Sequence, residues 1–157
     1  MGSGVAPVSE LLGSGVSVSL GADGAPCNNR LDKFTEMRSA ALLQKVSRGA
    51  AALPAARVLR LATLDGARAL GLEGEIGSLE TGKLADITVL ELGRLHTTPR
   101  PEVVSTVVYA AEARDVRDVL IDGRVVLRDG ELQTLDVREV VAEAAQQYEI
   151  LKSRSDI

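Results

Sequence analysis

The stretch from Val16 to Lys45 constrains the fold of this chain more than any other part of its 157 residues. In its first part, Val16, Val18 and Leu20 alternate with small polar residues, which predicts a short strand with two unlike faces. An aspartate, Asp23, follows within the glycine-rich turn Gly21–Gly24. Apolar residues then recur at helical spacing, which predicts a long amphipathic helix; they are Leu31, Phe34, Met37, Ala41 and Leu42. The order strand, turn, helix predicts a β/α unit.

Asp23 lies where the predicted strand ends. In β/α barrels the catalytic groups lie at the carboxyl ends of the strands. A carboxylate at such a place can hold a metal ion or accept a proton from water. The local alternative is an ordinary Asp-Gly turn, so Asp23 needs support from the rest of the sequence.

Two further motifs supply that support. Ala62–Leu72 leads through a turn into Ile76–Leu90, and Asp115–Val126 contains Asp122-Gly123 between apolar runs, a strong β-hairpin signal. Together with Gly21–Leu43, these motifs resemble the metal-dependent amidohydrolase superfamily, in the branch that holds cytosine, guanine and adenosine-derivative deaminases and s-triazine chlorohydrolases. Ala22 stands where that branch usually has threonine. The resemblance covers roughly residues 3–135.

The resemblance implies an α/β fold: the C-terminal part of a (β/α)8 metal-dependent hydrolase barrel plus part of a small β-sandwich domain. We expect residues 1–75 to form the last β/α units and the helices that follow them. Residues 76–135 would form the sandwich segment, and residues 136–157 a C-terminal helix and tail.

The resemblance also implies chemistry. Asp23 would bind a divalent metal, zinc first and iron second, and would accept a proton from metal-activated water. The reaction would hydrolyse C–N or C–Cl bonds of aminated heterocycles. Asn28 and Asn29 are candidates for substrate contact or loop ordering, with helix capping as the alternative.

Other residues carry weaker signals. Cys27 lies close to the strand end, but relatives often carry serine at that position, which argues against a metal ligand. The single histidine, His96, falls in a later loop, where we expect a surface or interface role. Lys83 and Asp86 recur in the resembled motif, and a turn or strand-edge role explains them better than catalysis.

The chain does not contain everything that such an enzyme needs. The superfamily draws its metal ligands from a His-x-His pair and further histidines, and a complete barrel takes about 250 residues. We therefore expect the C-terminal part of a larger enzyme, without a complete active site of its own. The alternative is a non-catalytic truncated module that oligomerises through open strand edges, and in either case we expect a homo-oligomer.

Composition excludes several other classes of protein. The net charge is −4, and the sequence has no basic stripe of the kind that binds nucleic acid. No apolar run approaches the length of a membrane span. The N-terminus has no Lys or Arg followed by an apolar stretch, the pattern of a signal peptide. A single cysteine excludes an internal disulfide framework. These features predict a cytoplasmic protein, and the small heterocyclic substrate is what the resemblance implies.

Overall fold

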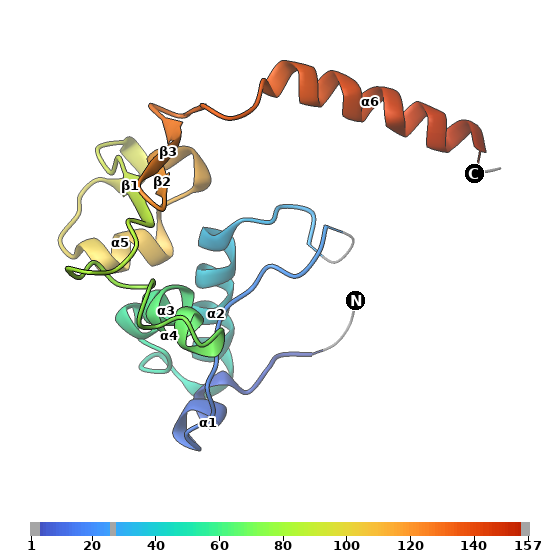
Figure 1. The fold of residues 1–157 in the computed structure, drawn as a ribbon. Coiled ribbons are helices and arrows are strands. Elements are labelled where there is room, and N and C mark those ends of the chain that lie inside the picture. Colours follow the sequence, from blue (N-terminus) through green and yellow to red (C-terminus); the bar gives the residue numbers. More distant parts are fainter. Residues whose placement is uncertain (1–3, 26–27, 155–157) are drawn as a thin grey trace.

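The computed structural model describes residues 4–25 and 28–154 and contains a group of helices, a small sheet and one outlying helix (Figure 1). The helices of the packed body are α1 (Val8–Gly13), α2 (Lys33–Arg48), α3 (Ala55–Ala62), α4 (Leu64–Ala69) and α5 (Val103–Tyr109). The sheet contains β1 (Ile87–Leu90), β2 (Val116–Ile121), β3 (Arg124–Arg128) and β4 (Glu131–Leu132). Short 3-10 helices cover Leu95–Thr97 and Ala113–Asp115, and α6 (Val137–Arg154) follows the sheet.

The core lies where α2, α3 and α5 pack together. Its buried residues come from all three helices, and they include Met37, Ala41, Val58, Leu61 and Val108. The core is built of small and aliphatic side chains, as a chain with only 2% aromatic residues requires. Burying them supplies the main driving force for this part of the fold.

Polar contacts fix the ends of these helices. The guanidinium of Arg38 on α2 donates to the carbonyl oxygen of Ala111, just after α5, at 2.8 Å. Asp65 in α4 is buried, and it lies 2.8 Å from Arg57 and 2.9 Å from Arg60 on α3. α2 ends at Gly49, whose φ of +98° favours glycine.

The segment expected to form a barrel strand is extended but is not a strand in this structure. Between residues 16 and 24 it has no β-ladder. Its backbone bonds to the helices are the Val16 N–H to the carbonyl oxygen of Leu11 at 3.0 Å and the Leu20 N–H to that of Leu61 at 3.3 Å. A strand exists only beside another strand, and no strand of the described residues lies alongside this segment. The expectation of a paired strand at Val16–Leu20 is therefore wrong for this chain, although the α/β class is correct.

The four strands form one antiparallel sheet in the order β1-β2-β3-β4. Ile87 pairs with Leu120, and Ile121 pairs with Arg124 across the hairpin. Asp122 and Gly123 turn the hairpin with φ values of +49° and +73°, as a two-residue turn requires. The predicted hairpin is thus confirmed, while the other edge of β1 has no strand beside it among the described residues.

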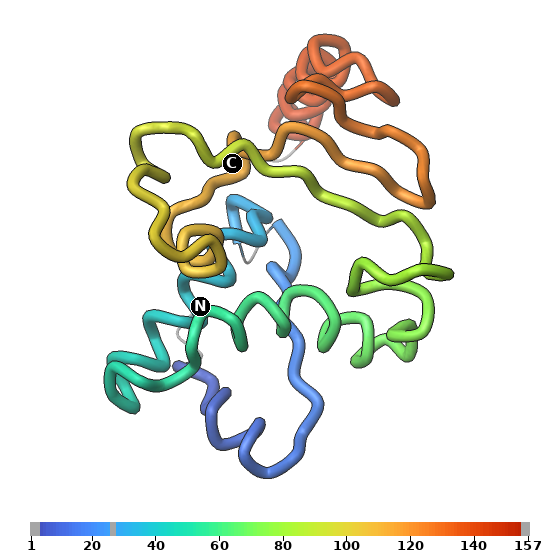
Figure 2. The backbone as a smooth tube through the Cα atoms, turned by 90° about the vertical axis from the view of Figure 1, so that its left-hand side faces the viewer, coloured from blue at the N-terminus to red at the C-terminus, as the bar shows by residue number. Residues whose placement is uncertain are grey.

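α6 stands apart from the rest of the molecule (Figures 1 and 2). Its first turn is capped by Asp136, whose Oδ1 accepts from the N–H groups of Arg138 and Glu139 at 2.8 and 3.2 Å. No residue of the helix is buried. This is the helix that the sequence predicted within residues 136–157. In residues 4–25 and 28–154, no helix is long and apolar enough to cross a membrane.

Candidate functional site

Asp23 lies at the end of the extended segment, on the chain that leads into α2. Its side chain is exposed, and its φ of +58° places the backbone in the left-handed region. Residues other than glycine rarely adopt this conformation, although aspartate tolerates it better than most. Asp122 and Asp129 adopt the same φ region in turns of the sheet, so the case for Asp23 as a candidate site rests on its place in the sequence motif.

The loop after Asp23 is held to α2 by Asn28. The Asn28 side-chain amide donates to the Glu36 carboxylate, and its Oδ1 accepts from the N–H of Arg30 at 3.1 Å. Asn28 therefore orders the loop, which is one of the two roles expected for it. Asn29 is exposed in the turn that follows. Cys27 lies outside the described residues.

The helix cap is not one of the two asparagines. Asp32 caps α2: its Oδ1 accepts from the Phe34 N–H at 2.9 Å, and its Oδ2 accepts from the Thr35 hydroxyl at 2.7 Å. The capping alternative for Asn28 and Asn29 is therefore wrong. The helix begins later than expected because Leu31, with a φ of +46°, separates the asparagines from its first turn.

The described residues do not form a metal site by themselves. Nowhere among them do three or more His, Cys, Asp or Glu side chains come together in a way that could hold a metal ion. Zinc sites use three or four protein ligands. Asp23 alone does not fit zinc, so any metal site that includes it needs ligands from outside the described part of the chain.

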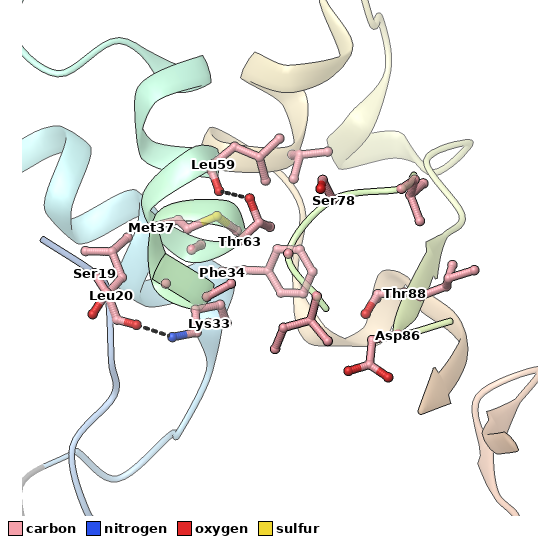
Figure 3. Close-up of a pocket in the computed structure, with 18 of the residues that line it drawn as sticks. Ser19, Leu20, Lys33, Phe34, Met37, Leu59, Thr63, Ser78, Asp86 and Thr88 are labelled. Atoms are coloured by element: carbon pink, nitrogen blue, oxygen red, sulfur yellow. Dashed lines mark hydrogen bonds between the residues drawn. The ribbon is translucent and has the colours of Figure 1, made fainter. Parts of the chain in front are cut away.

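A cleft lies elsewhere, between the helices and the sheet (Figure 3). It has a volume of about 850 Å³ and is open and mostly apolar. Phe34 and Met37 of α2 line one side, and Asp86 and Thr88 lie across from them (Figure 3). Beside it, the Lys33 ammonium donates to the carbonyl oxygen of Leu20 at 2.6 Å. Asp23 does not line this cleft, so the cleft and the candidate catalytic residue are separate features.

Sequence reasoning missed a buried ion pair at the start of β2. The Asp115 carboxylate is fully buried; its Oδ2 lies 2.8 Å from His96 Nε2 and accepts from the Glu112 N–H at 2.9 Å. Arg94 Nε lies 3.6 Å from Oδ1. Burial raises the pKa of Asp115, but the hydrogen bonds from His96 and Glu112 and the charges of His96 and Arg94 outweigh it, so that pKa lies below its ordinary value.

His96 is thus a structural partner and not merely a surface residue, since only 26% of its side chain is exposed. The two partners lie 19 residues apart, and no local pattern connects them. Lys83 and Asp86 have the structural roles expected for them. Lys83 donates to the carbonyl oxygen of Glu73 and to the Ser78 hydroxyl, and Asp86 accepts from the Asp122 N–H at the hairpin turn.

Comparison with known proteins places the chain in a family. The Amidohydrolase family matches residues 1–126, so the chain belongs to that family. It is 52% identical over 148 residues to a 5'-deoxyadenosine deaminase of Methanothermobacter thermautotrophicus, a match that covers 92% of this chain and 34% of the relative. It is 46% identical over 144 residues to a 5-methylthioadenosine/S-adenosylhomocysteine deaminase of Moorella thermoacetica, covering 91% and 34%.

Solved structures of a deaminase and of a chlorohydrolase also resemble this chain. An adenosine deaminase of Xanthomonas campestris with bound zinc superposes with a TM-score of 0.93 at 43% identity, covering 96% of this chain and 35% of that one. An atrazine chlorohydrolase of Arthrobacter aurescens in complex with zinc gives a TM-score of 0.84 at 26% identity, covering 93% and 33%. The chain therefore spans about a third of the length of the relatives that it matches.

Proposed function

We propose that this chain is the C-terminal part of a metal-dependent hydrolase that deaminates an aminated heterocycle. The observation that carries the proposal is Asp23, an exposed carboxylate in the loop that leads to α2, in a chain of the Amidohydrolase family. Residues 1–75 would belong to the barrel, residues 76–135 to the β-sandwich, and residues 136–157 to the C-terminal helix and tail.

Asp23 would act as general base and general acid. Its carboxylate would take a proton from the water that attacks the ring carbon and return it to the departing amino group as ammonia leaves. Asn28 would keep the loop in place through Glu36, and the exposed Asn29 would contact the substrate. Zinc, with iron second, is the metal that we propose for the complete protein, because the solved relatives contain zinc. Of the described residues, Asp23 would contribute one ligand to it.

The substrate class that we propose is a purine nucleoside with a modified 5' position. Identity to relatives named for adenosine derivatives reaches 52%, against 26% for the chlorohydrolase. The purine class rests on the identity to these relatives.

The proposal is tested in a joined polypeptide, in which this chain replaces the matched third of the Methanothermobacter deaminase. Ammonia release from 5'-deoxyadenosine is measured with and without Asp23→Asn. The substitution keeps the size of the side chain and removes the base, so we expect kcat to fall by about 10²–10⁴-fold, the range of general base catalysis.

Asp129→Asn is the matched control. Asp129 is also an exposed aspartate at positive φ, +50°, but it lies in the turn between β3 and β4. This variant should keep the full rate. Near-normal kcat in Asp23→Asn, with metal content unchanged, would mean that Asp23 is only a turn residue.

A further inference from the structure

α6 carries an apolar stripe along one face. Val137, Val140, Val141, Ala144 and Tyr148 recur at helical spacing and fall on one side of the helix. The side chains of Val140, Val141 and Tyr148 are 46%, 62% and 62% exposed. The opposite side carries Glu139, Ala142, Gln146 and Glu149. A stripe of this kind is the face that a helix usually buries.

The helix needs a partner to be stable. It has 18 residues, and several of them are β-branched valines, which lower helix propensity. Isolated helices of about this length are marginal in water, and most helices gain their stability by packing an amphipathic face. In this structure α6 lies away from the sheet and from the helical core (Figure 1).

The position of α6 points to what covers it. The Xanthomonas structure superposes on 96% of this chain, and the uncovered 4% is much shorter than the 18-residue helix. Most of α6 therefore has the same placement in a chain almost three times as long. The same outlying position in a longer chain is explained if the additional polypeptide supplies the packing surface.

We infer that α6 is a clasp helix: its stripe packs against the part of an amidohydrolase polypeptide that lies outside the third represented here. The surface that receives it is apolar and accommodates Val141 and Tyr148 as the main anchors. This inference concerns assembly and does not depend on Asp23 or on the proposed reaction. It can therefore fail while deamination is observed, or hold where deamination is absent.

The test compares two variants in the joined polypeptide described above. Val141→Gln/Tyr148→Gln removes two anchors, seven residues apart, from the stripe. Ala142→Gln/Glu149→Gln places the same residue type, with the same spacing, on the opposite face. We expect the first pair to lower Tm by about 5 °C or more and the second to leave it within about 1 °C. Equal effects of the two pairs would overturn the inference.

Hydrogen exchange of the α6 amides identifies the occupant. In the isolated chain, the amides should exchange rapidly at every protein concentration. In the joined polypeptide they should be protected at least about tenfold, and the stripe variant should remove that protection. Protection that rises with the concentration of the isolated chain would identify a second copy as the occupant, and unprotected α6 amides in the joined polypeptide would show that the stripe has no partner there. Either result overturns the inference.

Discussion

Asp115 is the residue whose environment has the clearest consequence for stability. Its folded pKa lies below the ordinary value of 3.8, because the bonds from His96 and Glu112 and the nearby positive charges outweigh its burial. A depressed carboxyl pKa contributes stability that is fully present above the unfolded pKa. This contribution is lost as the pH falls below 3.8 and through the lower folded value.

We expect Asp115→Asn to lower the free energy of unfolding at pH 7 by about 1–3 kcal/mol, because it leaves buried partners poorly satisfied. The same variant should lose less further stability than the unsubstituted chain as the pH falls below 3.8, since the titrating group is gone. Urea unfolding between pH 7 and pH 2.5 measures both effects. Asp122→Asn, at the exposed hairpin turn, is the control and should follow the unsubstituted chain. An Asp115→Asn variant with an unchanged pH profile would contradict this account.

Individual residues show where sequence reasoning succeeds and where it stops. Asp23, Asp86 and Asp122 were located by local motifs, because a turn depends on residues that are neighbours in the chain. The bond from His96 to Asp115 could not be predicted, because it forms only when the loop around Leu95–Thr97 folds against the start of β2. Asp65 was missed for the same reason, since its arginine partners come together only when α3 meets α4.

The start of α2 gives a prediction about an element. Asp32 satisfies the N–H of Phe34 and the hydroxyl of Thr35. Asp32→Ala should therefore destabilise the chain by about 1 kcal/mol, the usual cost of losing an N-cap. Asn29→Ala, three residues earlier in the exposed turn, should change the stability by less than about 0.5 kcal/mol. Thermal unfolding of the two variants measures the difference, and an equal loss in both would restore the asparagines as caps.

Elements that depend on neighbouring residues in the chain could be predicted from the sequence, and elements that depend on distant partners could not. The β2–β3 hairpin depends on a few adjacent residues around Asp122-Gly123, and it was predicted. The extended segment at residues 16–24 has the alternation of a strand but no neighbour to pair with, so the pattern alone gave the wrong result. Strand formation depends on a partner that a single segment cannot specify.

The whole molecule shows surfaces that a complete domain would bury. The apolar cleft between α2 and the sheet is open, β1 has a free edge, and α6 exposes its stripe. Large exposed apolar surfaces favour association. These surfaces are consistent with the expected homo-oligomer, which stays a prediction. The alternative of a non-catalytic module that oligomerises also stays a prediction. Both hypotheses predict a dimer or larger oligomer in light scattering. A clean monomer over a wide concentration range would contradict both.

Zinc binding is the property of the whole molecule that most sharply tests the proposal that this chain is part of a larger metal-dependent enzyme. Asp23 is a single exposed carboxylate, and the described residues bring no group of three potential ligands together. Tight zinc sites need three or four ligands. The isolated chain, dialysed against zinc and then against metal-free buffer, should therefore retain well under one ion per chain by atomic emission, and Asp23→Ala should not change that content. The joined polypeptide should retain about one, and less after Asp23→Ala. One tightly held zinc in the isolated chain, lost on Asp23→Ala, would show that a second copy or other residues of the chain complete the site.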